Sequence, residues 1–409
     1  MADQRKTRSP APIRVAILGA GPVGLEAALA ACDAGWPFTV YEGAPQVGGN
    51  VTRWDHVRLF TPWSMNVSER MARHLRSAGK EPPKDPDYCP DGSELVSELL
   101  QPLAELPELA GNLALGTHVL GVAREGLLKH QEIGTARRSE SPFRIVLRRP
   151  GGEVATATAT MVLDCTGTYG MPNAAGDGGV PAPGEHELGG QIVRELPNLR
   201  RDWDHWASQE ILLLGEGKSA QTVARDLAEL VPGSPGTHVV WAVRRSDPTW
   251  GEISNDPLPL RQALADSAKW IAAGNVPGLT VQSGLTVDSF QVSNGRIRVR
   301  LHGTAQREIT VDHVFSLTGY GPDTALYREL QVHECYATAA PMGLSAQLLG
   351  DAAGNCLDQP NYGVDVLRLP EPDFFLLGAK SYGRNSQFLM RIGYQQVSDV
   401  ACAYEPASP

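Results

Sequence analysis

The feature that most constrains the fold is a short apolar run that leads directly into a glycine-rich turn. Residues 15–18 read Val-Ala-Ile-Leu, and Gly19, Gly21 and Gly24 follow at the spacing GxGxxG before an alanine-rich stretch. This order predicts a strand, a phosphate-binding turn that includes Pro22, and a helix. Gly19 permits a tight turn, Gly21 lets the backbone approach a pyrophosphate, and Gly24 lets the helix pack closely on the strand. The helix N-terminus then offers free N–H groups to an anion, so the sequence predicts a dinucleotide site.

A second strand and an acidic residue support this interpretation over an ordinary glycine-rich loop. The strand is expected at residues 38–41 and ends in Glu42, which lies 42 − 19 = 23 positions after Gly19. That separation is close to the ~20 positions expected for the acid that binds a ribose hydroxyl. The pair Gly48-Gly49 follows and suits a chain that bends around a cofactor, although a simple surface turn is the alternative.

The same order of signals occurs again in the middle of the chain. Residues 211–214 form an apolar run that leads into Gly215, Gly217 and Ala220 at the spacing GxGxxA. Alanine is the next smallest residue at the third position, which the dinucleotide fingerprint allows. A second dinucleotide unit is therefore expected here, with Lys218 and Ser219 placed to contact phosphate.

The two units differ in the charge at the end of their second strand. The strand expected at residues 238–243 ends in Arg244 and Arg245, where the first unit has Glu42. An acid favours a ribose hydroxyl, whereas arginines favour a 2′-phosphate through charge-assisted hydrogen bonds. We therefore expect FAD at the first site and NADPH at the second; a solvated strand end is the alternative for the two arginines.

Composition limits the class of protein. The chain has 409 residues, 42% hydrophobic and 20% charged, which is typical of a globular protein of two or three domains. The net charge of −10 argues against non-specific binding to nucleic acid. No apolar run approaches the ~20 residues of a membrane span, and a cytoplasmic location is expected. The six cysteines include no CxxC and are expected to be reduced, and no spacing indicates a metal site.

The remaining elements follow from periodicity and from turn residues. Helices are expected over residues 93–109 (capped by Asp91 or Ser93), 255–273 and 386–403. Short strands are expected at residues 117–122, 143–148 and 161–163, and a further set of strands over 279–314. Residues 75–92 and 129–141 are predicted as loops, the second exposed and variable. His186 and His205 are interpreted as isolated structural residues.

Taken together, these motifs resemble the flavoproteins with two dinucleotide-binding domains, and within them the flavin-containing monooxygenases, from about residue 13 to residue 403. The resemblance rests on the two turns, on Thr-Gly at residues 166–167 and 318–319, and on Leu377-Gly378. Ala379 follows where the disulfide reductases of this architecture usually have Asp, and residues 394–396 stand where the monooxygenases carry Glu-x-Gln. Two departures stand out. The signature aromatic-x-Gly-x-x-x-His has Leu and Arg at its ends in residues 188–194, and Pro62 replaces the Asn expected near the flavin.

The resemblance implies an α/β fold with two Rossmann-like, three-layer ββα domains. The NADP-binding domain, residues 185–323, is inserted in an FAD-binding domain made of residues 13–184 and 324–409, after a disordered tail at 1–12. The implied FAD residues are Gly19, Gly21, Pro22, Gly24, Glu42, Gly49, Arg58, Thr61, Trp63, Val119, Thr166, Gly167 and Gly378. The implied NADP residues are Gly215, Gly217, Lys218, Ser219, Arg244, Arg245, Thr318 and Gly319.

Residues for the chemistry itself are less sharply indicated. Aromatic and polar residues around Trp63 suit a planar ring, although a core position is as good an explanation. The candidates that face the ring or the substrate are Trp63, Asn66, Tyr382, Arg384 and Asn385, with Arg384 suited to an anionic substrate.

Three functions are compatible with these features. The first is a monooxygenase that passes hydride from NADPH to FAD and uses O2 to oxygenate a small amine, sulfur or ketone substrate. The second is an NADPH-dependent reductase, dehydrogenase or oxidase without a redox disulfide, because Cys165 stands alone beside Thr166-Gly167. The third is a nucleotide-binding sensor without turnover. A monomer or a homodimer is expected, with neither nucleic acid nor membrane as a partner.

Overall fold

The computed structural model describes residues 12–350, 357 and 359–405, so residues 1–11 of the predicted tail lie outside the described part. Contacts divide the chain into two compact units. Unit 1 contains the described residues of Met1–Asp55, Thr61–Gly170 and Gly321–Pro409. Unit 2 contains His56–Phe60 and Met171–Tyr320. Each unit is described by itself below.

Unit 1 is built on a parallel sheet of five strands in the order β16-β7-β1-β2-β3. The strands are β1 (Val15–Leu18), β2 (Phe38–Tyr41), β3 (Leu113–Ala114), β7 (Met161–Asp164) and β16 (Phe374–Leu376). Asp164 is in register with Leu18 on one side and with Leu376 on the other. The segments that follow β1, β7 and β16 therefore meet at the carboxyl edge of the sheet, where ligands of such sheets bind.

A small antiparallel sheet and a layer of helices complete unit 1. The antiparallel sheet consists of β4 (His118–Arg124), β5 (Phe143–Arg148) and β6 (Val154–Ala159), and its apolar side chains share a core with β1, β7 and β16. Helix α1 (Pro22–Asp33) is buried from Val23 to Ala31 and packs against α3 (Glu69–Ser77) and α13 (Met390–Tyr404). A helix whose surface is largely apolar needs such cover.

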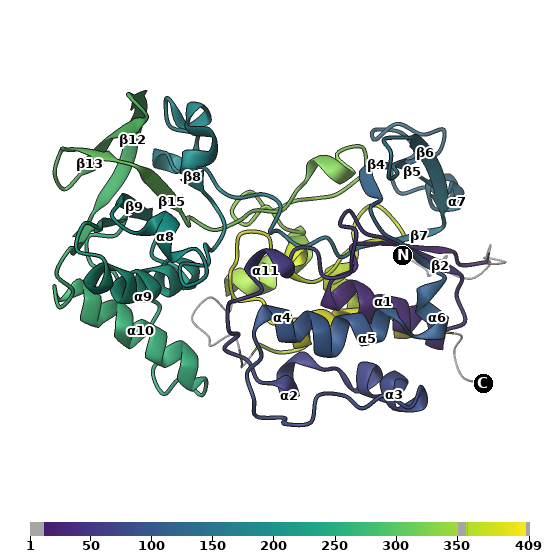
Figure 1. The fold of residues 1–409 in the computed structure, drawn as a ribbon. Helices are drawn as coiled ribbons and strands as arrows, with labels where there is room; N and C mark the ends of the chain where they lie inside the picture. Colours follow the sequence, from purple (N-terminus) through teal and green to yellow (C-terminus); the bar gives the residue numbers. More distant parts are fainter. Residues whose placement is uncertain (1–11, 351–356, 358, 406–409) are drawn as a thin grey trace. The chain divides into compact units, whose positions relative to one another are not determined.

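Unit 2 repeats this architecture. Its parallel sheet has the order β11-β10-β9-β15-β8, and the antiparallel strands have the order β12-β13-β14. The parallel strands are β8 (Ile192–Val193), β9 (Glu210–Leu214), β10 (His238–Val243), β11 (Leu279–Ser283) and β15 (His313–Ser316). The antiparallel ones are β12 (Leu285–Ser293), β13 (Arg296–Gly303) and β14 (Arg307–Val311). Helices α9 (Lys218–Gly233) and α10 (Pro259–Ala272) pack side by side (Figure 1).

Shorter helices connect these elements. In unit 1 they are α2 (Trp63–Asn66), α4 (Gly92–Glu94), α5 (Gln101–Ala104), α6 (Pro107–Ala110), α7 (Ala136–Glu140), α11 (Met342–Gly350), α12 (Ala379–Tyr382) and the 3₁₀ turns Thr52–Trp54, Ala325–Tyr327 and Val364–Leu367. In unit 2 they are α8 (Trp203–Trp206) and the 3₁₀ turns Asp177–Gly179 and Glu185–Gln191. The α/β class with two Rossmann-like units is thus confirmed.

The helix predicted over residues 93–109 is interrupted. Asp91 caps its start through a reciprocal capping box with Glu94, so Asp91 rather than Ser93 is the cap. A π-helical stretch, Leu95–Leu100, precedes Pro102, whose missing N–H and ring disrupt regular α-helical bonding. Pro107 ends the run because the residue before it, Leu106, is extended.

Other differences lie in polar segments. The predicted exposed loop at residues 129–141 contains α7, in which Arg138 is only 1% exposed. Strand β6 was missed because its Ala-Thr alternation lacks apolar contrast. Helix α3 extends to Ser77 within the loop predicted from residue 75, and the last helix begins at Met390 rather than near Ser386.

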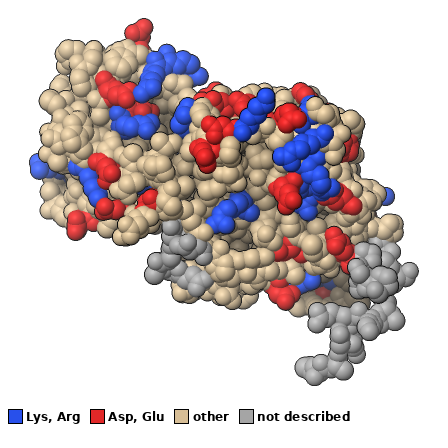
Figure 2. All heavy atoms as spheres, turned by 90° about the horizontal axis from the view of Figure 1, so that it is seen from below, with Lys and Arg blue, Asp and Glu red and all other residues tan. Residues whose placement is uncertain are grey.

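The surface carries both signs of charge. On the face shown in Figure 2, Lys and Arg side chains lie among Asp and Glu side chains and form no single large block. Among the described residues, no helix is both long enough and apolar enough to cross a membrane.

Candidate functional site

The first glycine turn of unit 1 has the geometry of a dinucleotide cradle. Gly19 has φ +94°, and a Cβ there would lie 2.9 Å from the Cys165 carbonyl oxygen. A Cβ on Gly24 would lie 1.9 Å from the Gly19 carbonyl oxygen, so only glycine lets α1 approach the turn. A Cβ on Gly21 would meet nothing within 4 Å. The protein thus leaves open the space over Gly21, where a pyrophosphate approaches.

Glu42 lies beside this turn, as expected. Its carboxylate accepts hydrogen bonds from the backbone N–H of Ala20 at 2.7 Å and of Ala44 at 2.9 Å. A Cβ on Gly49 would meet the Ala44 side chain at 2.2 Å and Glu42 Oε1 at 3.2 Å. These contacts fix the carboxylate at the end of β2, and each of its oxygens keeps a lone pair for a ribose hydroxyl.

The C-terminal segment returns to the same turn. Gly378 has φ +70°, and its N–H donates to Gln396 Oε1 at 2.8 Å. A Cβ on Gly378 would lie 3.1 Å from Val23 Cγ2, and one on Gly393 would lie 2.5 Å from the same atom. The starts of α12 and α13 therefore pack against the first turn of α1.

Sequence reasoning missed a buried ion pair at this edge of the sheet. Lys380 Nζ lies 2.7 Å from Asp164 Oδ2, and both side chains are fully buried. The ammonium group also donates to Thr166 Oγ1 at 3.0 Å and lies 5.2 Å from the centroid of the Tyr327 ring. Asp164 Oδ1 accepts from the N–H of Thr166 at 3.1 Å and from its hydroxyl at 2.7 Å. The available signal is Asp164 at the end of an apolar run, two residues before Thr166-Gly167.

The titratable groups next to this pair are held neutral. Burial raises the pKa of the Cys165 thiol, and the charge of Asp164 raises this pKa further, while Lys380 acts in the opposite direction. Burial likewise raises the pKa of Tyr327. A thiol with a raised pKa is a poor nucleophile, because the thiolate is the reactive form.

The predicted residues around Trp63 form a self-contained network. Trp63 is 3% exposed and Asn66 is 1% exposed. Thr61 Oγ1 donates to Asn66 Oδ1 at 2.7 Å, and Asn66 Nδ2 donates to the Thr61 carbonyl oxygen at 2.8 Å. Tyr394 donates to the Asn66 carbonyl oxygen at 2.7 Å. These bonds give Asn66 a structural role in the loop, and its role in chemistry stays a prediction.

The predicted residues of the C-terminal turn differ in exposure. Tyr382 is 1% exposed, and its hydroxyl donates to Gln359 Oε1 at 2.7 Å. Asn385 Oδ1 accepts from the N–H of Gln387 at 3.0 Å. Arg384 is exposed and is fixed through its backbone N–H, which donates to the Thr338 carbonyl oxygen at 2.7 Å. Of these three, Arg384 is the side chain most open to a ligand.

Three further predicted FAD residues take different positions. Val119 is partly buried on β4 against the core of unit 1. Gly167 has φ +70°, and a Cβ there would meet nothing within 4 Å. Arg58 is exposed and belongs to the segment His56–Phe60, which groups with unit 2.

The second glycine turn has the same construction. Gly215 has φ +116°, and a Cβ there would lie 2.3 Å from the Leu317 carbonyl oxygen. Ala220 is fully buried where α9 meets the turn, and the space over Gly217 is open within 4 Å. Trp241 Nε1 donates to the Gly215 carbonyl oxygen at 2.7 Å.

The Thr-Gly ending of unit 2 lies next to this turn, as the contact between Gly215 and Leu317 shows. Thr318 Oγ1 donates to the Asn173 carbonyl oxygen at 3.1 Å, and the N–H of Asn173 donates to the Gly319 carbonyl oxygen at 2.9 Å. Gly319 has φ +90°.

The cationic residues of unit 2 are not equivalent. Lys218 is tied down, since Nζ donates to Gln221 Oε1 and to the Trp250 carbonyl oxygen, both at 3.1 Å. Burial lowers the pKa of Lys218, and the charge of Arg261 lowers it further. Arg244 is exposed and makes no hydrogen bond or ion pair within the described part of the chain, whereas Arg245 pairs with Glu216 at 2.9 Å. Ser219 is partly exposed at the second position of α9.

The altered signature segment at residues 188–194 has a structural role. Leu188 is 2% exposed in the core of unit 2. Arg194 pairs with the buried Glu185 at 2.7 Å, and this carboxylate also accepts from the N–H groups of Ala175 and Ala182. The Arg that stands in place of His thus neutralises a buried acid.

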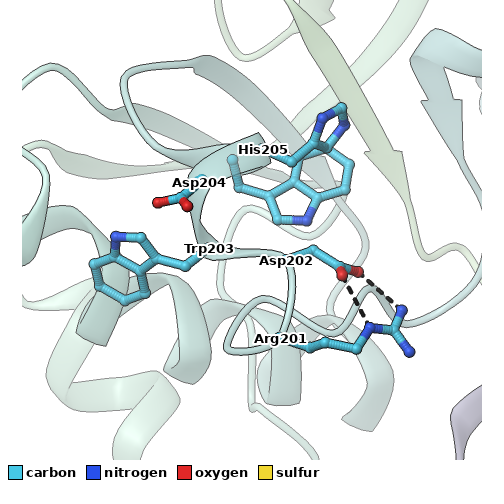
Figure 3. A pocket seen from close by; sticks show the side chains of 6 residues that line it. Arg201, Asp202, Trp203, Asp204 and His205 are labelled. Carbon is cyan, nitrogen blue, oxygen red and sulfur yellow. Dashed lines mark hydrogen bonds and ion pairs between the residues drawn. The ribbon is translucent and has the colours of Figure 1, made fainter.

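A separate hollow of unit 2 lies around α8 and is lined by residues 201–206. Figure 3 shows Arg201 paired with Asp202, with Trp203, Asp204 and His205 around them. The sequence suggests that His205 is isolated. In the structure, the centroid of its ring lies 4.3 Å from that of Trp206 and 5.5 Å from that of His313. Helix α8 precedes β9 and the glycine turn follows it, so this hollow lies at the opposite edge of the sheet from the turn.

Both turns therefore fit a dinucleotide: each has open space over its middle glycine and a helix N-terminus without a side-chain cap. Among the described residues, no group of three His, Cys, Asp or Glu side chains suits a metal ion. Two such units define the class: the chain has the fold of the flavoproteins with two dinucleotide-binding domains, a flavin-dependent pyridine-nucleotide oxidoreductase fold.

Solved structures of this fold come from two functional groups. The chain is similar to bacillithiol disulfide reductase Bdr from Bacillus cereus, at 17% identity and a TM-score of 0.69, covering 96% of this chain and 98% of that one. It is similar to the cadaverine monooxygenase DfoA from Erwinia amylovora, at 13% identity and a TM-score of 0.65, covering 98% and 96%. It is also similar to the ornithine N-hydroxylase of Kutzneria sp. 744, at 14% identity and a TM-score of 0.64, covering 97% and 100%. No protein-family model matches the sequence, and a comparison with curated proteins likewise finds no match.

Proposed function

We propose that this protein is an FAD- and NADPH-dependent monooxygenase that oxygenates a small amine, sulfur or ketone substrate. The observation that carries the proposal is the pair of open glycine turns with opposite charges beside them. Glu42 stands beside the turn of unit 1, and Arg244 and Arg245 stand at the corresponding strand end of unit 2. This charge pattern suits a ribose hydroxyl at the first site and a 2′-phosphate at the second.

The flavin, when bound, supplies the hydride acceptance and the oxygen activation. The residues of this chain bind and orient it. The N-terminus of α1 would hold the pyrophosphate and Glu42 would hold the adenosine ribose, while Gly378 lets the C-terminal segment close against α1. Lys380 and Asp164 hold the Thr166 hydroxyl in place through hydrogen bonds at the same edge of the sheet.

Thiol chemistry is disfavoured, although the fold is also that of disulfide reductases. Among the described residues, Cys32, Cys165, Cys335 and Cys402 form no disulfide. Cys165 is the cysteine next to the FAD turn, and its raised pKa keeps it a neutral thiol. A monooxygenase needs no thiolate, which supports the proposal. The structurally similar amine hydroxylases suggest primary amines as the first substrates to test.

The test is turnover of the purified holoprotein. Addition of NADPH without oxygen is expected to bleach the spectrum of the oxidised flavin. In the presence of O2, mass spectrometry should then detect a product heavier by one oxygen when the substrate is ornithine, cadaverine, a thioether or a cyclic ketone. Rapid NADPH oxidation that yields only peroxide or reduces another acceptor with every compound would favour the reductase or oxidase alternative. A flavin that stays oxidised would indicate a sensor.

The coenzyme assignment has its own control. Arg244→Ala is expected to raise the KM for NADPH by about tenfold and to leave the KM for NADH unchanged, since only NADPH has the 2′-phosphate. The matched variant is Arg225→Ala, which removes an exposed arginine of α9 that pairs with Asp226. It should change neither constant.

A further inference from the structure

We propose that Glu216 sets the coenzyme preference of unit 2: it pairs with Arg245, withholds this guanidinium from a 2′-phosphate, and offers a carboxylate oxygen to a 2′-hydroxyl. The inference rests on the proposed binding of a nicotinamide dinucleotide at the turn from Gly215 to Ala220. It adds a specificity-determining residue inside the turn itself.

The topology brings the two side chains to one edge. Glu216 lies between Gly215 and Gly217, two residues after the end of β9, and Arg245 lies two residues after the end of β10. Strands β9 and β10 are parallel neighbours, with Leu214 in register with Ala242. Arg245 Nε lies 2.9 Å from Glu216 Oε1, so the pair spans the place where the adenosine ribose of a bound dinucleotide is expected.

The two oxygens of this carboxylate differ. Oε1 forms the ion pair with Arg245 Nε, but Oε2 is buried and has no hydrogen-bond partner among the described residues. In unit 1, by contrast, both oxygens of Glu42 accept backbone N–H groups. A buried acceptor without a donor is unfavourable, and a ligand hydroxyl at this point would satisfy it.

The cation of the pair is only partly committed. The Arg245 side chain is 56% exposed, and its Nη1 makes one long hydrogen bond, 3.4 Å, to Thr249 Oγ1. A 2′-phosphate therefore has to draw Arg245 away from Glu216 while it approaches a carboxylate of its own sign. A 2′-hydroxyl meets no such repulsion and donates to Oε2. Arg244, which is exposed and outside the pair, then supplies the attraction for the phosphate.

The experiment measures nucleotide binding by calorimetry on the purified flavoprotein, with 2′,5′-ADP and ADP as probes. Glu216→Gln keeps the size of the side chain and removes its charge. It is expected to strengthen 2′,5′-ADP binding by about tenfold and to leave ADP binding unchanged or weaker. Glu216→Ala should act in the same direction. In an Arg245→Ala background, the gain from Glu216→Gln should shrink, because the freed cation is absent.

The control is Glu229→Gln, which removes an exposed glutamate of α9 that pairs with Arg200. In Glu229→Gln, the ratio of the affinities for 2′,5′-ADP and ADP should stay at the wild-type value. The inference is overturned if Glu216→Gln and Glu216→Ala both leave this ratio unchanged while wild-type protein binds the probes. If wild-type protein binds neither probe, the proposed coenzyme site fails, and the inference fails with it.

Discussion

Lys380 is a lysine that the fold buries completely beside the first dinucleotide turn. Its partner Asp164 lies 2.7 Å away and is equally buried. Lys380→Met would leave the Asp164 charge without compensation, and we expect the free energy of unfolding to fall by about 3–5 kcal/mol. Denaturant unfolding measures this loss.

The matched exposed pair is Arg149 with Glu153, at 3.4 Å. Because solvent screens exposed charges, Arg149→Met should cost less than about 1 kcal/mol. Adding Asp164→Asn to Lys380→Met should recover part of the loss. Equal small effects at both pairs would contradict the burial argument.

His313 makes the stability of unit 2 depend on pH. Burial lowers its pKa, and the His205 imidazole lowers it further, while Asp312 acts in the opposite direction. The folded-state pKa thus lies below the usual value of about 6.5. The stability of the fold with His313 neutral is fully present above about pH 6.5. It is lost as the pH falls towards the folded-state pKa, because in this range the unfolded chain binds more protons than the folded chain.

The prediction is a steeper loss of stability in wild-type protein than in His313→Gln between pH 7 and pH 5, measured by denaturant unfolding. His238, which is exposed at the start of β10, provides the control. His238→Gln should follow the wild-type curve. Parallel curves for wild type and His313→Gln would refute the assignment.

At the scale of elements, α7 shows how one buried arginine holds a polar segment. Arg138 is 1% exposed, and it reaches Glu371 at 2.6 Å and the carbonyl oxygens of Leu128 and Gln131. Arg124 pairs with the same carboxylate at 2.7 Å. Arg138 therefore joins the segment around α7 to the residues before β16.

Arg138→Ala is expected to lower the free energy of unfolding by about 3 kcal/mol or more and to expose residues 125–141 to proteolysis. The neighbouring Arg137, 70% exposed beside Glu132, provides the control. Arg137→Ala should cost less than about 1 kcal/mol and leave the cleavage rate unchanged. Limited proteolysis read by mass spectrometry separates the two variants.

For the whole molecule, the proposed binding of FAD places different constraints on two glycines. Gly21 has an extended backbone with open space over it, so the Gly21→Ala variant should fold normally. It should weaken FAD binding by about tenfold or more, because the methyl group would enter the space where the pyrophosphate is expected. Gly24→Ala would place a Cβ 1.9 Å from a backbone oxygen and should destabilise the fold itself. Flavin content and circular dichroism distinguish these outcomes; full flavin occupancy in Gly21→Ala would contradict the cradle.

The two glycine turns, the strands that lead into them and the fold class can be predicted from the amino-acid sequence alone. Local chemistry explains this success. A GxGxxG turn after a buried strand permits few conformations, and Glu42 follows at a fixed distance along the chain. The interruption of the predicted helix at Pro102 and Pro107 also has a local cause. The sequence pattern does not predict it, because helical periodicity continues across both prolines.

Which charged side chains lie together depends on the three-dimensional fold. Lys380 meets Asp164 across 216 positions, and Arg138 meets Glu371 across 233. The local sequence does not show which residue each of these side chains meets, because the partners are brought together only by the tertiary fold. The same holds for Glu216 and Arg245, whose side chains meet because β9 and β10 are parallel neighbours. Spacing along the chain identifies the turn; strand order decides which side chains surround it.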